Sequence, residues 1–129
     1  MKLYDSQMAP NPRRVRIFLA EKGIDVPLVA MDIGKQEHKT DDFIASINQL
    51  GQIPTLELDD GSHLSESVAI CRYFEETHPE PSLFGRTATQ RAVIENWNRR
   101  AEIEGMTSVS DALRNTLPMF AERGLVGAP

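Results

Sequence analysis

Gln52-Ile53-Pro54-Thr55 places a proline directly before a run of strand-forming residues. Proline has no N–H to give to a β-ladder, so we expect Pro54 at the first position or the edge of a strand. Cis peptide bonds occur at X-Pro steps in tight turns, and we predict a cis bond between Ile53 and Pro54. Such a turn leaves the backbone N–H and C=O of Ile53 pointing outward, where an extended peptide can pair with them.

Two further motifs follow this turn. Asp59-Asp60-Gly61 lies between two short apolar stretches and predicts a β-hairpin. Ser65-Glu66-Ser67 then opens a helix, and the first N–H groups of a helix bind anions readily. A strand edge that pairs with a peptide backbone, next to a helix end that binds a carboxylate, predicts a small acidic peptide as the ligand.

The composition is that of a packed globular protein. The chain has 129 residues, 40% of them hydrophobic, which is enough for one domain with a core. Fourteen basic and nineteen acidic residues give a net charge of −5, which argues against a nucleic-acid partner. The single cysteine, Cys71, excludes a disulfide framework and a Cys-x-x-Cys redox pair. We find no signal peptide and no long apolar run, and expect a soluble, cytoplasmic protein without a membrane partner.

The remaining patterns alternate between strands and helices. Asn11 is the expected N-cap of the first helix, Gly23 is its expected end, and Lys22 finishes its apolar stripe as a lysine that reaches solvent. The resulting order, β-α-β-α-β-β-α, predicts an α/β domain with a four-stranded mixed sheet and an early right-handed crossover. In chain order the expected elements are strand 2–5, helix 12–22, strand 26–33, a short helix from 40 or 41 to 47, strands 54–58 and 62–64, and helix 66–77.

The second part of the chain has a different character. We expect a first domain over 1–78, a linker with two prolines over 79–86, and a helical segment over 87–129. Ile94, Trp97 and Ala101 form one apolar stripe of a helix that starts near Thr87. One amphipathic helix cannot build a domain alone, so its exposed apolar side either needs a partner or makes the chain prone to aggregation.

Several motifs, in this order along the chain, carry a family resemblance: residues 2–6 (KLYDS), 13–23 (RRVRIFLAEKG), 51–56 (GQIPTL), 65–70 (SESVAI) and 98–102 (NRRAE). They resemble the amino-terminal domain of cytosolic glutathione transferases, and are closest to the theta-like and Gtt2-like branches. The resemblance implies a thioredoxin-like fold, followed by the first helix or helices of an incomplete all-α domain. Family members continue well beyond residue 129, so we expect either a fragment or a truncated relative.

The resemblance implies that the ligand is glutathione and gives a role to each matching residue. Ile53, positioned by Pro54, would pair with the cysteinyl backbone of glutathione. Glu66 and Ser67 would hold its γ-glutamyl end, with the Ser67 N–H and hydroxyl on the carboxylate. Glutathione acts as a co-substrate, and neither a cofactor nor a metal is implied.

The same resemblance places basic residues at the other end of the ligand. His38 and Lys39 would meet the glycyl carboxylate, and Gln52 would add a hydrogen bond without charge. Outside the family context, His38 and Lys39 would be read as part of a solvated loop. The arginines of the first helix, Arg13, Arg14 and Arg16, are interpreted as a solvated helix face.

The group that ionises the glutathione thiol is not evident from the motifs. A free thiol has a pKa near about 8.5, and lowering it by about 2 units takes roughly 2.7 kcal/mol of thiolate stabilisation. Theta-like relatives have a serine where this chain has Ala9, and Tyr4 does not match the tyrosine of other branches. Candidates are the helix start at Asn11, the Ser6 hydroxyl, and a second-domain serine, Ser108 or Ser110. The Gtt2-like branch favours the second domain and carries a serine where Ser110 stands.

The leading interpretation is a glutathione transferase, or part of one, that conjugates glutathione to electrophilic small molecules. The resemblance implies a homodimer that works in detoxification. One alternative is a glutathione-dependent disulfide reductase, to which Pro10-Asn11 points, and another is a non-catalytic glutathione-binding module, favoured by Ala9. Isomerisation as in the zeta branch is less favoured, because its serine-rich signature is absent. The sequence does not name the electrophile.

Overall fold

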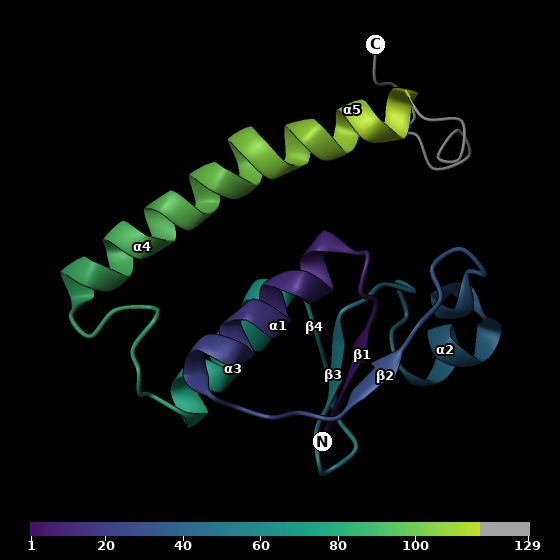
Figure 1. Ribbon diagram of the computed structural model, residues 1–129, viewed down its shortest axis with the longest axis horizontal. Coiled ribbons are helices and arrows are strands. Elements are labelled where there is room, and N and C mark those ends of the chain that lie inside the picture. The colour runs from purple at the N-terminus through teal and green to yellow at the C-terminus, as the bar shows by residue number, and fades with distance from the viewer. Residues whose placement is uncertain (117–129) are drawn as a thin grey trace. The chain divides into compact units, whose positions relative to one another are not determined.

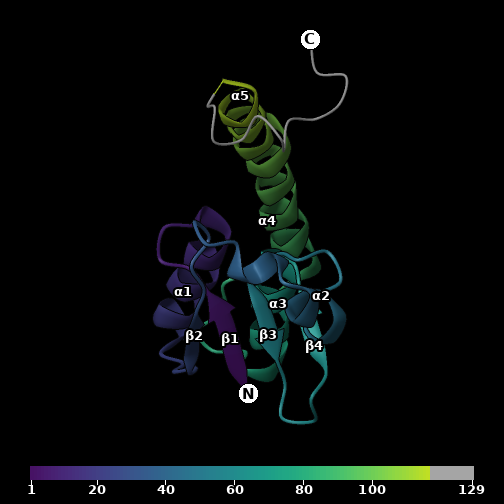
Figure 2. The same ribbon diagram turned by 90° about the vertical axis from the view of Figure 1, so that its right-hand side faces the viewer.

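In the computed structural model, which describes residues 1–116, four short strands form one mixed sheet. The order of the strands is β2-β1-β3-β4, as Figure 2 shows. Strands β1 and β2 are parallel, and the other two pairs are antiparallel. This confirms the expected four-stranded mixed sheet. The strands are β1 (Lys2–Asp5), β2 (Leu28–Ala30), β3 (Thr55–Glu57) and β4 (His63–Ser65).

Strand β2 is shorter than the predicted strand over 26–33. Its partner β1 has only four residues, so regular pairing is limited to that length. Two hydrogen bonds extend the contact at the ends: the Leu3 N–H donates to the Pro27 carbonyl at 2.8 Å, and the Met31 N–H donates to the Asp5 carbonyl at 2.7 Å.

Three α-helices flank the sheet: α1 (Pro10–Lys22), α2 (Asp41–Ser46) and α3 (Ser67–Thr77). Helices α1 and α3 cover one face, and α2 lies on the other, as Figure 1 shows. Tyr4 of β1 makes an edge-to-face contact with Phe43 of α2, with ring centroids 5.6 Å apart. Side chains alternate along a strand, so Leu3 faces α1 and α3. The core on that face consists of Leu3, Val15, Leu19, Leu56, Ile70 and Phe74, all buried.

The start of α1 differs from the prediction. The helix begins at Pro10, and its N-cap is Ala9 rather than Asn11. Ala9 is extended, with φ −85° and ψ 135°, because a following proline disfavours helical backbone at the preceding residue. Pro10 suits the first helical position, where no N–H is needed. Gly23 ends the helix in the left-handed region at φ 65°, as expected.

Lys22 does not reach solvent, in contrast to the prediction. Its Nζ lies 2.7 Å from Glu75 Oε2 of α3, and the Lys22 side chain is fully buried. The same ammonium donates to the carbonyls of His78 (2.6 Å) and Pro81 (2.9 Å). A buried charge requires a partner of opposite sign, and Glu75 supplies it from an element that is distant in sequence.

The chain divides into two units, Met1–Leu83 and Phe84–Pro129. In the described part of the second unit, α4 (Ala88–Arg100), the π-helical segment η2 (Ala101–Thr107) and α5 (Ser108–Thr116) form one uninterrupted helical run (Figure 1). Thr87 and Gln90 form a reciprocal capping box at its start, which confirms the helix predicted from Thr87. Within residues 1–116, none of the helices has both the length and the apolar character that a bilayer crossing requires.

Candidate ligand-binding site

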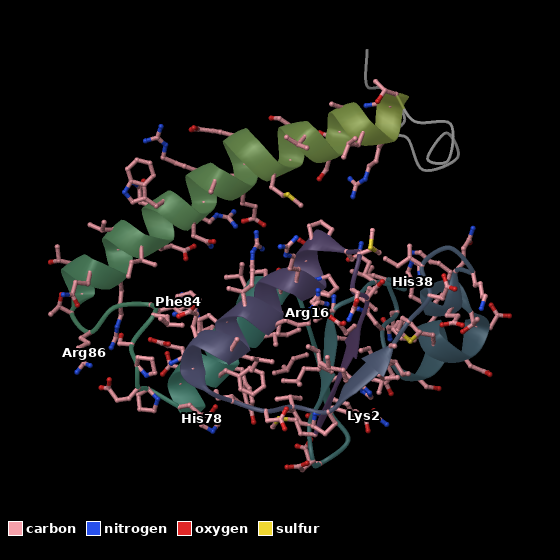
Figure 3. All side chains as sticks on the ribbon, in the orientation of Figure 1. Lys2, Arg16, His38, His78, Phe84 and Arg86 are labelled. Carbon is pink, nitrogen blue, oxygen red and sulfur yellow. The ribbon has the colours of Figure 1, made fainter. Side chains whose placement is uncertain are left out.

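The register of the sheet brings three segments, far apart in sequence, to one end of the first unit. Tyr4 pairs with Thr55, and Thr55 pairs with Ser65. The residues that follow β1, precede β3 and follow β4 therefore share the end of the sheet at which β1 finishes. Figure 3 shows Arg16 and His38 toward this end and Lys2 at the opposite one. The segments assembled here are Ser6, the Ile53-Pro54 turn and Glu66-Ser67.

The turn before β3 has the predicted cis bond between Ile53 and Pro54. Neither the N–H nor the C=O of Ile53 makes a backbone hydrogen bond within the part of the chain that the structure describes. The backbone of Ile53 is therefore open for an extended partner, as the sequence predicted.

Asn48 holds this turn from behind, and the sequence reasoning missed it. Its Nδ2 donates to the Gln52 carbonyl and to Thr55 Oγ1, each at 3.0 Å. Its Oδ1 accepts from the Leu50 N–H, also at 3.0 Å. The side chain is buried, with the residue 8% exposed. An asparagine shortly before a glycine turn is a known turn signal, which is the cue that the sequence offered.

The third segment begins α3 with an unusual backbone. Glu66, its N-cap, has φ 69° and ψ 116°, a region that residues other than glycine seldom occupy. Its side chain does not cap the helix, so it satisfies none of the first-turn N–H groups. Ser67 is buried at 5% exposure, and its Oγ accepts a 2.9 Å hydrogen bond from Arg14 Nη1. The start of α3 thus presents backbone donors next to a guanidinium.

The arginines of α1 are not the solvated face that the sequence suggested, apart from the exposed Arg13. Arg14 reaches Ser67, as described above. Arg16 pairs with Asp5 at 2.5 Å and donates to the carbonyls of Ser6 (3.2 Å) and Gln7 (3.1 Å). Its neighbours one turn away, Pro12 and Leu19, are both buried. Helical spacing from those apolar residues is the signal that places Arg16 beside the core.

His38 and Lys39 lie in a short 3-10 helix, η1 (Glu37–Lys39), beside the Gln52 turn. His38 is buried at 7% exposure, so it is not part of a solvated loop. Lys39 Nζ donates to the Leu50 carbonyl at 3.0 Å. Gly51, at φ 55°, lies so close that an added Cβ would be 2.8 Å from the His38 carbonyl oxygen. The approach of η1 places the Lys39 side chain at the Leu50-Gly51 backbone, directly before the exposed Gln52.

The start of α1 retains few donors for a thiolate. Pro10 and Pro12 have no N–H, and the Arg13 N–H donates to the Ala9 carbonyl at 3.2 Å. Among residues 1–116 the Asn11 N–H makes no backbone hydrogen bond, so it is the donor that remains in the first turn. The Asn11 side chain is exposed and has no capping role.

The serine candidates lie in different units. Ser6 follows β1 and is buried, and its carbonyl accepts from Arg16 and from the Ala9 N–H. Ser108 begins α5 and is exposed, whereas Ser110 is half-buried in the same helix. The structure brings Ser6 and the start of α1 together in the first unit, and Ser110 belongs to the second.

Two other ionisable groups near the core are held in their neutral forms. Burial, followed by a hydrogen bond to Glu57, raises the pKa of Tyr4, whose hydroxyl donates to Glu57 Oε2 at 2.9 Å. Burial also raises the pKa of Cys71 to about 11, although the nearby Arg14 guanidinium opposes this shift. Neither group is available as a ready base or nucleophile at neutral pH.

Comparison with known proteins finds relatives that match most of the chain. A family model described as the glutathione S-transferase N-terminal domain matches residues 3–82. Glutathione S-transferase 2 of Saccharomyces cerevisiae is 40% identical over 120 residues, which cover 92% of this chain and 51% of that protein. Maleylacetoacetate isomerase of Pseudomonas aeruginosa is 36% identical over 94 residues, 71% of this chain and 44% of that protein.

A solved structure also matches the chain over most of its length. The crystal structure of a Gtt2-class glutathione S-transferase of Vibrio parahaemolyticus matches with a TM-score of 0.78 at 40% identity, covering 88% of this chain and 55% of that one. The chain spans about half the length of the two curated relatives it matches, 51% and 44% respectively.

Proposed function

Because the chain belongs to the glutathione S-transferase superfamily, in its Gtt2-like branch, we propose that it binds glutathione at this end of the sheet. The observation that carries the proposal is the open backbone of Ile53, at the same end of the sheet as the start of α3. Pairing with Ile53 would hold the cysteinyl residue of glutathione, and Glu66 with Ser67 would hold its γ-glutamyl end. His38, Lys39 and Gln52 would meet the glycyl carboxylate.

The proposed reaction is attack of the glutathione thiolate on an electrophilic small molecule. Ionising the thiol near neutral pH requires donors that favour the thiolate, and several donors acting together each contribute a few kcal/mol at most. The proposed donors are the Asn11 backbone N–H, the Ser6 hydroxyl and Ser110. The free Asn11 N–H supports the first of these, since the other residues of that turn offer none.

The biological setting is proposed from the family as well. Residues 1–78 would form the glutathione-binding domain, 79–86 the linker, and 87–129 the beginning of the helical domain. We propose a cytoplasmic homodimer that detoxifies electrophiles, with glutathione as co-substrate and no cofactor or metal. The net charge of −5 supports the proposal that nucleic acid is not a partner.

Direct assays distinguish conjugation from two other glutathione-dependent reactions. A relative named maleylacetoacetate isomerase makes isomerisation one of them, and disulfide reduction is the other. Wild-type protein with glutathione should conjugate chlorodinitrobenzene faster than it reduces bis(hydroxyethyl) disulfide or isomerises maleylacetoacetate. Glutathione binding without activity in any of these assays would support a binding module instead.

The binding proposal is tested by calorimetry with glutathione. Ser67→Ala removes one hydrogen bond to a charged carboxylate, so binding should weaken by about 1.5–3 kcal/mol. Ser65→Ala is the matched control, because Ser65 is an exposed serine two residues away, in β4. Equal affinities of Ser67→Ala and wild type would contradict the assignment, and a wild type that binds no glutathione would overturn the proposed function.

A further inference from the structure

Arg14 is a half-buried cation that contacts the start of a different helix. Its Nη1 lies 2.9 Å from Ser67 Oγ, across 53 residues of sequence. Within residues 1–116 the structure records no ion pair for Arg14, whereas Arg16, two residues on, is paired with Asp5. A guanidinium held beside a helix N-terminus adds positive charge to a place that is already favourable for anions.

The direction of this hydrogen bond follows from the chemistry of the two groups. A guanidinium has N–H donors and no acceptor, so Ser67 Oγ must be the acceptor. A serine hydroxyl has one O–H hydrogen, and accepting from Arg14 leaves that hydrogen for another acceptor. Arg14 therefore sets the Ser67 hydroxyl as a donor.

We propose that Arg14 is a positioning residue that turns the Ser67 hydroxyl toward the α-carboxylate of the γ-glutamyl group and adds charge beside it. This inference rests on the proposed function. The carboxylate would accept one hydrogen bond from the Ser67 N–H, which the side chain of Glu66 does not cap, and a second from the Ser67 O–H, which Arg14 orients. Charge-assisted hydrogen bonds of this kind strongly favour a ligand that has the carboxylate over one that lacks it. The site would therefore require a ligand with a free α-carboxylate.

The test compares two ligands that differ only in this carboxylate: glutathione and γ-aminobutyryl-cysteinyl-glycine. Calorimetry on the full chain should show that Arg14→Met weakens glutathione binding by about tenfold or more. Binding of the analogue should stay unchanged, because it has no carboxylate to lose. Arg13→Met is the control, since Arg13 is exposed on the same helix and should leave both affinities as in wild type.

Three results with the Arg14 variants would overturn the inference. Equal weakening of both ligands would show that Arg14 only packs α1 against α3, and unchanged glutathione binding would show that it has no role.

If Arg14→Met does not fold, as judged by circular dichroism, Arg14→Lys and Arg14→Gln replace it. Because Arg14→Lys keeps the positive charge, it should lose less affinity than Arg14→Gln, and equal losses would contradict the role of charge. Absence of glutathione binding in wild type would instead refute the proposed function, and this inference with it.

Discussion

Asn48 and Arg14 show how single side chains shape the site from outside it. Asn48 fixes the Gln52 carbonyl and Thr55, on either side of Ile53 and Pro54. Arg14 acts on Ser67 in a comparable way from α1. In both cases a residue without a proposed ligand contact holds a residue that would contact the ligand. The binding residue therefore has its geometry before the ligand arrives.

Cys71 illustrates the cost of burying an ionisable group. Its pKa is raised by burial from 9.0 to about 11, and the residue is 3% exposed. Below pH 9 the thiol is neutral in both the folded and the unfolded chain and does not affect stability. As pH rises from about 9 to about 11, the unfolded chain ionises first, so stability should fall by up to about 3 kcal/mol.

Urea denaturation at pH 8 and pH 10 checks this prediction. At pH 10 about half of the loss should be present, roughly 1.4 kcal/mol. Cys71→Ala lacks the thiol, so its free energy of unfolding should fall by roughly 1.4 kcal/mol less than that of wild type between pH 8 and pH 10, whatever its value at pH 8. The same alkaline loss in both proteins would show that the thiol ionises as easily in the folded state as in the unfolded one.

At the scale of the elements, the Lys22–Glu75 pair joins the ends of α1 and α3. Lys22 also donates to two carbonyls in the segment after α3, while the Leu83 N–H and the Ser82 hydroxyl donate to Glu75. One buried ion pair thus connects two helices and the segment 78–83. Figure 3 shows His78 at the end of α3, away from the site.

Lys22→Met should therefore destabilise the first unit strongly. It leaves the Glu75 carboxylate without its ammonium partner in a buried position, at a cost of about 3–5 kcal/mol in the free energy of unfolding. Lys22→Met with Glu75→Leu should recover much of this loss, because the buried carboxylate is removed together with its ammonium partner. Urea denaturation of both variants measures the difference. Additive losses in the double variant would mean that the two side chains do not interact energetically.

At the scale of the whole molecule, the proposed thiolate donors come from both units. Ser6 and Asn11 belong to Met1–Leu83, and Ser110 to Phe84–Pro129. No hydroxyl occupies the position before α1 where related enzymes of the theta-like branch have a serine, since Ala9 stands there. The stabilisation of the thiolate is therefore expected to be shared rather than assigned to one residue.

Conjugation rates of three alanine variants test this sharing. Ser6→Ala should be mild, because the Asn11 N–H and Ser110 remain. Asn11→Ala should also be mild, since the available donor is its backbone N–H and the substitution keeps it. Ser110→Ala should be the most damaging change. Complete loss of activity from Ser6→Ala, with the fold intact by circular dichroism, would make Ser6 the catalytic residue and contradict the shared mechanism.

Features that depend on neighbouring residues could be predicted from the amino-acid sequence. Pro54 lacks an N–H and restricts its own φ, Gly23 tolerates a positive φ, and Thr87 with Gln90 caps a helix within one turn. Each of these constraints acts over a few residues. The order of the elements, the mixed sheet and the open backbone of Ile53 followed from them.

The side-chain contacts that support the site required the folded chain. Arg14 with Ser67 and Lys22 with Glu75 are each 53 residues apart, and both lysine and arginine had looked like solvent-facing residues of an amphipathic helix. Helical periodicity shows which face of α1 is apolar, but it does not show what that face packs against. Only the packing of α1 on α3 brings the Ser67 hydroxyl and the Glu75 carboxylate within reach of these long side chains. Once that packing excludes water, each cation needs a polar partner, and these two groups supply it.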